Sequence, residues 1–126
     1  MPTTTECVFC PVDTYESHSL ITANELAYAI WDFKPVAPGH SLVIPRAHRE
    51  NYFALNNGEI NAILELSKAV KTIVDAQFSP AGYNIFSNVG KAAGQVVMHA
   101  HVHLVPRYPN DEFIRLGDRN QPDELV

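Results

Sequence analysis

The fold is decided by the stretch His99-Ala100-His101-Val102-His103-Leu104-Val105-Pro106-Arg107. Three of the six histidines of the chain lie in it, each separated from the next by one small or apolar residue. An apolar pattern with a period of two predicts a half-buried strand, on which alternate side chains point to opposite faces. We therefore expect all three imidazoles on one face. The residues that alternate with them should point into a core: Met98, Ala100, Val102 and Leu104.

The outer two histidines of such a strand are about 13 Å apart, because a strand rises by roughly 3.3 Å per residue. The three rings cannot all bind one atom, so they should have different roles. Two of them could share a zinc ion. Alternatively, a neutral imidazole could act as a nucleophile near neutral pH while a neighbour moves a proton or binds an anion. A solvent-facing strand without chemistry is the third possibility, and the strand alone does not decide among them.

Length and composition describe a globular protein of one domain, expected to cover residues 1–126 with tails at 1–5 and about 108–126. The chain is 46% apolar and only 18% charged, which suits a packed core. Its net charge is −5 with no basic run, so we do not expect binding to nucleic acid or to a membrane. Neither a signal peptide nor a spanning apolar run is present, which predicts a cytoplasmic location.

The two cysteines of the chain, Cys7 and Cys10, form a C-x-x-C pair. In a reducing compartment such a pair indicates metal binding or redox chemistry rather than a structural disulfide. Thioredoxin-like redox chemistry needs a helix after the pair, whereas Pro11 and the polar residues that follow it favour a turn. The pair is therefore either half of a zinc site or two packed thiols.

Besides the histidine strand, the sequence predicts four strands, at residues 19–22, 26–31, 41–44 and 82–88. The first two should form a hairpin, because Asn24-Glu25 between them is typical of a turn.

One helix is expected over residues 56–78, where apolar residues recur at helical spacing. Asn56 is the predicted N-cap, and Glu59 is placed at the third helical position as in a capping box. The helix carries no residue typical of catalysis and should cover a sheet. Its buried stripe should contain Ile60, Ile63, Leu64, Val70, Ile73 and Val74.

Two loops carry polar side chains that could bind a ligand. The loop at 32–40 contains two prolines and a glycine, which prevent regular structure and make it rigid. Asp32 at its start could accept hydrogen bonds from the hydroxyls of a sugar, or it could simply cap a turn. The loop at 89–95 could offer backbone N–H groups, and the amides of Asn88 or Gln95, to a phosphate.

Together these segments resemble the histidine triad family. The sequence HAHVHLV at 99–105 is similar to the family's His-x-His-x-His signature followed by two apolar positions. The segment DFKPVAPGHSLVIPRAH at 32–48 is similar to its loop-and-strand motif. NIFSNVG at 84–90, followed by AGQ at 93–95, resembles the segment before the triad. The resemblance implies an α+β fold, with a mostly antiparallel five-stranded sheet, one main helix packed on it, and a homodimer.

The resemblance also implies a hydrolase that binds a purine nucleotide and attacks its α-phosphorus. His101 would be the nucleophile, and water would release a nucleoside monophosphate from it. His103 would bind the α-phosphate and the leaving group, His99 would orient the strand or bind metal, and His40 would join the same cluster. The attacking ring must be neutral with a free Nε2, so its Nδ1–H needs a fixed acceptor, which we expect to be a nearby backbone carbonyl.

The implied nucleotide-binding residues are Asp32 for the ribose hydroxyls, Asn88 near the phosphates, Gly94 and Gln95 in the loop, and an apolar base pocket of Val8, Phe9, Tyr28, Ile30 and Phe33. The implied metal ligands are Cys7, Cys10, His48 and His99, which match the set of zinc-containing members. They would form a closed structural Zn²⁺ site that ties the N-terminal segment to the sheet.

One residue departs from the family pattern. Val96 stands where the phosphoramidase branch typically carries a serine, and valine cannot donate a hydrogen bond through its side chain. This disfavours efficient phosphoramidase activity and leaves diadenosine polyphosphate hydrolysis open. Two other functions also stay open: a nucleotide-binding regulatory module with little turnover, and a metalloenzyme that uses the triad as a catalytic zinc site.

Overall fold

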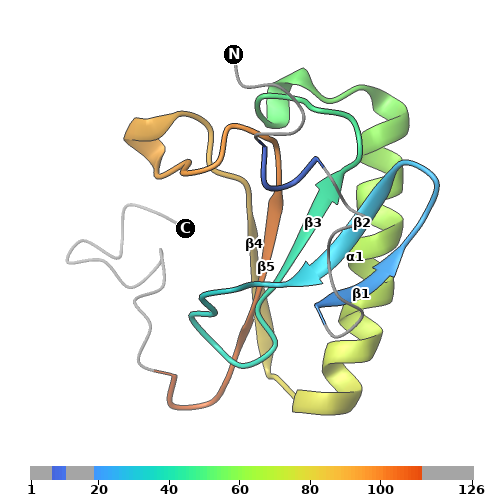
Figure 1. The fold of residues 1–126 in the computed structure, drawn as a ribbon. Coiled ribbons are helices and arrows are strands. Elements are labelled where there is room, and N and C mark those ends of the chain that lie inside the picture. The colour runs from blue at the N-terminus through green and yellow to red at the C-terminus, as the bar shows by residue number, and fades with distance from the viewer. Residues whose placement is uncertain (1–6, 11–18, 112–126) are drawn as a thin grey trace.

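The computed structural model describes residues 7–10 and 19–111 (Figure 1). The turn expected after Cys10, and most of the two expected tails, lie outside the described residues. Within them the chain forms one five-stranded sheet, one long helix and two short 3-10 helices. In chain order the elements are β1 (Leu20–Ala23), β2 (Ala27–Trp31), β3 (Ser41–Pro45), η2 (Tyr52–Ala54), α1 (Asn57–Phe78), β4 (Gly82–Phe86), η3 (Lys91–Ala93) and β5 (Val102–Arg107).

The sheet has the strand order β1-β2-β3-β5-β4, and every neighbouring pair is antiparallel. The predicted hairpin is present, because Ala23 at the end of β1 pairs with Tyr28 near the start of β2. The histidine strand β5 lies inside the sheet between β3 and β4, where His103 pairs with Leu42 on one side and with Phe86 on the other. The predicted α+β class is therefore confirmed, with one main helix on a five-stranded antiparallel sheet.

Helix α1 begins and ends where the sequence indicates. Asn56 accepts a hydrogen bond from the backbone N–H of Glu59 at 2.8 Å, and the Glu59 carboxylate accepts one from Asn56 at 2.9 Å. This is the predicted capping box, which satisfies two N–H groups that the first turn leaves without partners. Ser79 closes the helix in the left-handed conformation, with φ at 53°. No helix of the described residues is long and apolar enough to cross a membrane.

The buried stripe of α1 differs from the predicted one. Ile63, Val70 and Val74 are buried as expected, but Ile60 and Leu64 are 38% and 52% exposed, and Ile73 is half-buried. The buried stripe instead includes Ala62 and Leu66 and begins at the buried carboxylate of Glu59. The reason is geometric: the helix has more apolar positions than one stripe can hold, and its rotation is fixed by the capping residues and the sheet rather than by hydrophobicity alone.

The sheet separates two cores. On the face toward α1, small residues of β2 allow the helix to approach the strand closely. The core on this face includes Ala27, Ala29, Val43, Val102 and Leu104. The opposite face holds the alternating residues of the same strands together with the N-terminal segment: Cys7, Phe9, Tyr28, Ile30, Leu42 and Ile44. Figure 1 shows α1 on one side of the sheet, with the loops after β2 and β4 reaching away from it.

The histidine strand is shorter than predicted. Strand β5 begins at Val102, so His99 and His101 precede the ladder. The backbone N–H of Ala100 donates to the carbonyl of Arg49 at 2.6 Å, outside any strand pairing. The preceding strand is also shorter, because β4 ends at Phe86 and Ser87 then donates its hydroxyl to the carbonyl of His101. The alternation holds for Val102 and Leu104, which pack in the core under α1, whereas Met98, also predicted to point into the core, is only half-buried.

Candidate functional site

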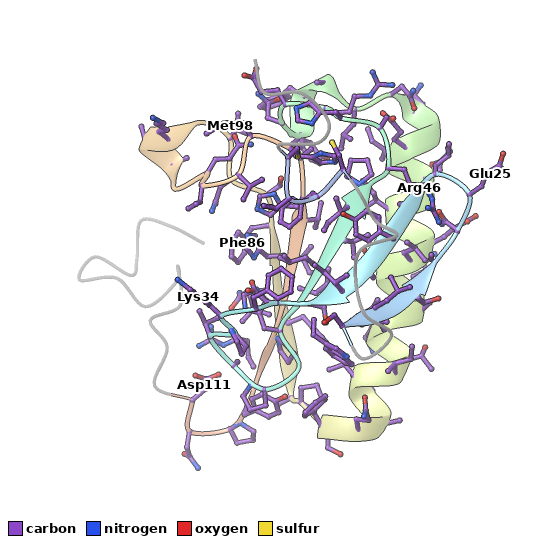
Figure 2. The ribbon with its side chains drawn as sticks, viewed as in Figure 1. Glu25, Lys34, Arg46, Phe86, Met98 and Asp111 are labelled. Atoms are coloured by element: carbon purple, nitrogen blue, oxygen red, sulfur yellow. The ribbon has the colours of Figure 1, made fainter. Side chains whose placement is uncertain are left out.

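The histidines of the triad gather on the face of the sheet opposite α1. Because Val102 and Leu104 of β5 point toward the helix, His103 between them points away from it. In Figure 2, Phe86 lies between the segment that carries Met98 and the loop that carries Lys34. The Phe86 ring stacks on His103 with the centroids 4.7 Å apart and the planes inclined by 16°. The candidate site therefore lies where these two loops meet the middle of the sheet.

Four side chains far apart in the sequence form a Cys/His cluster, which comprises Cys7, Cys10, His48 and His99. Nδ1 of His99 lies 3.3 Å from Sγ of Cys7 and 3.5 Å from Sγ of Cys10, and Nδ1 of His48 lies 3.1 Å from Sγ of Cys10. The four ligand atoms all lie within 4.8 Å of one another. A tetrahedral zinc ion with these donors has ligand-to-ligand distances of about 3.5 Å, so the cluster fits this ion.

The orientation of His99 suits a metal ligand. Its Nε2 lies 2.8 Å from the carbonyl oxygen of Pro45, and a carbonyl can only accept a hydrogen bond. Nε2 therefore carries the proton, and Nδ1 presents a lone pair to the two sulfurs. Burial lowers the pKa of His99, which keeps the ring neutral. Burial also raises the pKa of Cys10 to about 11, with contributions from Cys7, so binding of a metal would release protons from the thiols.

His101 has the protonation pattern that nucleophilic attack requires. Its Nδ1 lies 2.8 Å from the carbonyl oxygen of His99, which is the backbone acceptor that the sequence argument expected. Nδ1 must therefore carry a proton, and in the neutral ring Nε2 retains its lone pair. The ring is 8% exposed, and the edge of the Phe9 ring packs against it with the centroids 5.1 Å apart. His101 is thus held in one tautomer and one orientation.

A second group of polar side chains, the Asp/His cluster, comprises Asp32, His40 and His103. Nε2 of His40 lies 3.0 Å from Nδ1 of His103 and 3.2 Å from Oδ2 of Asp32. Burial lowers the pKa of His103 to about 4, with further lowering by His101 and His40 and an opposing effect of Asp32. Burial likewise lowers the pKa of His40 against the opposing charge of Asp32. Both rings are therefore neutral at neutral pH.

The loop at 32–40 places the Asp/His cluster rigidly. Gly39 has a φ of +86°, and a Cβ there would lie 3.1 Å from side-chain atoms of both Val74 and Phe78 of α1, so only glycine fits. The loop is closed by a hydrogen bond from the N–H of Asp32 to the carbonyl of His40 at 3.0 Å. Asp32 also caps the turn, since its Oδ1 accepts from the N–H of Lys34 while Oδ2 faces His40.

The residues expected to surround the base are divided between the core and the surface. Tyr28 and Ile30 are fully buried, and Phe9 is nearly so, in the core opposite α1. The Tyr28 hydroxyl donates to the carbonyl of Phe9. Val8 and Phe33, in contrast, are more than half exposed. Contact of a base with this set stays a prediction, and Val8 and Phe33 are the members that a ligand reaches without rearrangement.

The loop that precedes the triad is held by Gln95, whose amide is engaged within the protein. Its oxygen accepts from the N–H of Gly90 at 2.8 Å, and its nitrogen donates to the carbonyls of Glu50 and Val97 at 2.7 and 3.0 Å. This corrects the expectation that the amide of Gln95 is free to meet a phosphate. Binding of a nucleotide by Asn88 and Gly94 stays a prediction. The side-chain amide of Asn88 donates a long hydrogen bond, of 3.4 Å, to the carbonyl of Gly94.

An ion pair between a buried carboxylate and a partly exposed arginine, which the sequence did not reveal, joins the helix to the triad. The Arg49 Nε lies 3.0 Å from both carboxylate oxygens of Glu59, whose side chain is 4% exposed. The carbonyl of Arg49 accepts the hydrogen bond from Ala100, which lies between His99 and His101. The capping pattern identified Glu59 as a helix residue, but no local signal connects it with Arg49.

The fold and the site together define a histidine triad protein with an adjoining Cys/His cluster. The HIT domain family matches residues 14–110, and the chain therefore belongs to this family.

Two relatives illustrate the range of the family. An HIT-like protein of Saccharolobus solfataricus is 38% identical over 113 residues, which cover 86% of this chain and 78% of the relative. An adenosine 5'-monophosphoramidase of Schizosaccharomyces pombe is 32% identical over 108 residues, covering 85% of this chain and 77% of the relative.

Solved structures have the same fold. An HIT family protein from Bacillus anthracis superposes with a TM-score of 0.81 at 34% identity, over 98% of this chain and 89% of that one. A zinc-bound histidine triad protein from Mycobacterium smegmatis superposes with a TM-score of 0.79 at 28% identity, over 96% of this chain and 88% of that one.

Proposed function

We propose that the protein is a nucleotide hydrolase or transferase that forms a nucleotidyl-histidine intermediate on His101. The observation that carries the proposal is the hydrogen bond from Nδ1 of His101 to the carbonyl of His99, because it leaves Nε2 as the only nucleophilic nitrogen of a neutral ring. The name of the adenosine 5'-monophosphoramidase relative supports a purine nucleotide as substrate.

In the first step, Nε2 of His101 forms a bond to the α-phosphorus, and the bond from phosphorus to the leaving group breaks. The ring becomes cationic, and its Nδ1–H remains directed at the carbonyl of His99, which stabilises the charge. In the second step, water attacks the phosphorus and releases a proton to solvent, the bond to Nε2 breaks, and a nucleoside monophosphate leaves the neutral ring of His101. Charge on the phosphoryl oxygens is stabilised by fixed hydrogen-bond donors, and loss of one such donor typically slows catalysis about 10²–10³-fold.

The substrate class that we propose is a phosphoramidate or a diadenosine polyphosphate, and Val96 bears on the choice. Its side chain is 88% exposed and offers no hydrogen bond to a leaving group. A leaving group that is already a good anion, such as a nucleoside polyphosphate, depends least on such a donor. Diadenosine polyphosphates are therefore the better candidates of the two.

The Cys/His cluster fits a structural zinc ion rather than a catalytic one. Its four ligand atoms form a closed set, whereas a catalytic zinc ion keeps one position open for water or substrate. When bound, the ion would cross-link the segment of Cys7 and Cys10 to His48 and His99. No step of the proposed reaction needs the zinc ion.

The cytoplasm remains the predicted location of the protein.

We also propose that the protein is a homodimer, as the family resemblance implies. Strand β4 forms an edge of the sheet and carries two exposed apolar residues, Ile85 at 62% and Phe86 at 42%. The helix contacts β4 at Tyr83, whose hydroxyl donates to Asp75 of α1, whereas Ile85 farther along the strand stays exposed. An open apolar edge of this kind is suited to pair with a second copy of the chain.

The decisive experiment is intact-protein mass spectrometry after brief mixing with an adenosine phosphoramidate and, separately, with a diadenosine polyphosphate. We expect a transient mass gain of one adenylyl group that maps to His101. The matched control is His101→Asn, which should form no adduct but still bind adenosine monophosphate in calorimetry. If the wild type binds the nucleotide but forms no adduct and shows no turnover with either substrate, the nucleotide-binding module replaces the enzyme.

A further inference from the structure

The positions of the protons in the Asp/His cluster follow from one backbone amide. The N–H of Val36 lies 3.2 Å from Nδ1 of His40 and donates to it. A backbone N–H can only donate a hydrogen bond, so Nδ1 of His40 is the acceptor and carries no proton. In the neutral ring the proton must then reside on Nε2.

The proton on His40 in turn determines that of His103. The Nε2–H of His40 has two acceptors, Nδ1 of His103 at 3.0 Å and Oδ2 of Asp32 at 3.2 Å. A direct bond between His103 and Asp32 is excluded, because Nδ1 and Oδ2 lie 4.0 Å apart. Nδ1 of His103 is thus an acceptor, and its proton must lie on Nε2. The stacked ring of Phe86 and the nearby edge of His101 hold the plane of His103.

We propose that His40 is a positioning residue that locks His103 in the Nε2–H tautomer, so that His103 meets the phosphate as a neutral hydrogen-bond donor. His101 and His103 then have opposite tautomers. His101 directs a lone pair from Nε2, and His103 directs an N–H from the corresponding atom. The role of His103 toward a phosphate rests on the proposed function, whereas the tautomer itself does not.

The same proton argues against a second metal site. Ligand atoms of Asp32, His40 and His103 lie within 4.8 Å of one another, a set that could hold a metal ion by distance alone. A metal ion on Nε2 of His40 would require the proton on Nδ1, where it would face the N–H of Val36. Two donors would then oppose each other without an acceptor. We therefore expect zinc to bind the Cys/His cluster and not the Asp/His cluster.

The test is long-range ¹H–¹⁵N NMR of the zinc-loaded protein with ¹⁵N-labelled histidines, which identifies the tautomer of each ring. The His103 signals are assigned by their loss in His103→Asn. We expect the wild type to show His103 as Nε2–H and His101 as Nδ1–H. In His40→Met, the donor that makes Nδ1 of His103 an acceptor is lost, so His103 should no longer be held wholly in the Nε2–H tautomer.

Two matched variants separate positioning from packing. His40→Gln can place an amide N–H near the position of Nε2, so it should restore the Nε2–H tautomer of His103. Phe86→Leu removes the stacked ring but not the hydrogen bond, so it should leave the tautomer unchanged. With the substrate of the adduct experiment, His40→Met should lower kcat by about 10²-fold, the usual effect of losing one donor, and His40→Gln should recover part of it.

A wild-type His103 in the Nδ1–H tautomer overturns the proposal, and this result needs no variant to fold. Retention of the Nε2–H tautomer in His40→Met overturns it as well. Neither outcome affects the formation of an adduct on His101. Conversely, absence of an adduct removes the proposed function and leaves the tautomer assignment intact, so the two failures are distinguishable.

Discussion

The carbonyl oxygen of His99 lies 2.8 Å from Nδ1 of His101, and Nε2 of the same His99 lies 2.8 Å from the carbonyl oxygen of Pro45. One residue therefore links the Cys/His cluster to the proposed nucleophile. Its ring presents Nδ1 to the sulfurs, while its backbone fixes the tautomer of His101. Phe9, between the two cysteines, packs on the rings of both His99 and His101. Loss of order in the Cys/His cluster should therefore also disorder the ring of His101.

Removal of zinc should therefore destabilise the protein and disturb His101. A chelator, or Cys10→Ser, should lower the free energy of unfolding by roughly 3 kcal/mol, which corresponds to a fall in Tm of about 10 °C. Calorimetry of the loaded and stripped protein measures the shift, and metal analysis should give one zinc ion per chain. An unchanged Tm after complete removal of zinc would contradict the structural role. Abolished turnover with an intact fold would instead favour catalytic zinc.

Stability should also depend on pH through His103. Its pKa is lowered from an ordinary value of 6.5 to about 4 by burial and by His101 and His40. The unfolded chain then binds more protons than the folded one between these values. The stabilising effect of the neutral ring is complete above pH 6.5 and is lost as the pH falls toward 4. His40 acts in the same direction, because its pKa is also lowered.

Urea unfolding at pH 7, 6 and 5 measures this dependence. The wild type should lose stability as the pH falls, and His103→Asn should show a shallower decline because asparagine binds no proton. The ring C–H signal of His103 in NMR should keep its neutral position at pH 5.5. Titration of that signal near pH 6.5 would show that burial does not hold the ring neutral.

Much of the fold could be predicted because its signals are local. The capping residues Asn56 and Glu59, the apolar run of β3 and the alternation after Val102 each act within a few residues. The rotation of α1 could not be predicted, since both Ile60 and Ile63 are apolar and only packing on the sheet decides which is buried.

The sequence named the residues that the structure gathers in the two clusters, but it did not predict where their protons lie. Motif spacing brought the ligands and histidines together in the expected places, and it suggested a backbone acceptor for His101. The tautomers of His40 and His103 depend on the N–H of Val36, which every residue except proline possesses and which no sequence pattern marks. The hydrogen bond from Gln95 to the carbonyl of Glu50 could not be predicted either, because it joins segments far apart in the chain.

The ion pair between Arg49 and Glu59 should support the triad at a distance. Glu59→Gln removes the charge but keeps an oxygen for the capping box, so it isolates the ion pair. We expect a loss of about 1 kcal/mol, because a charge-assisted hydrogen bond is weakened whose arginine is partly exposed to solvent. Asn56→Ala is the matched variant: it removes the cap and not the ion pair, at a cost of about 1 kcal/mol.

The two variants should differ at the triad. Because the carbonyl of Arg49 accepts from Ala100, Glu59→Gln should shift the NMR signals of the His99 and His101 rings, and Asn56→Ala should leave them nearly unchanged. Urea unfolding provides the energies, and the histidine NMR spectra provide the second readout. Equal spectral changes in both variants would show that the ion pair acts only through the stability of α1.

The edge strand β4 should carry the dimer contact, and two lysine substitutions can locate it. Ile85 pairs with Leu104 and thus points to the helix side of the sheet, but it stays 62% exposed although Tyr83 of the same strand contacts α1. Leu64 is a comparable exposed apolar residue, 52% exposed, on α1 itself. A charge in an apolar contact is costly when it has no partner. Light scattering should therefore find the wild type and Leu64→Lys as dimers and Ile85→Lys as a monomer. The reverse pattern would move the contact to the helix, and a monomeric wild type would remove the proposed dimer.

Phe86, next to Ile85, points to the other face and stacks on His103, so dissociation at β4 should also alter the NMR signals of the His103 ring.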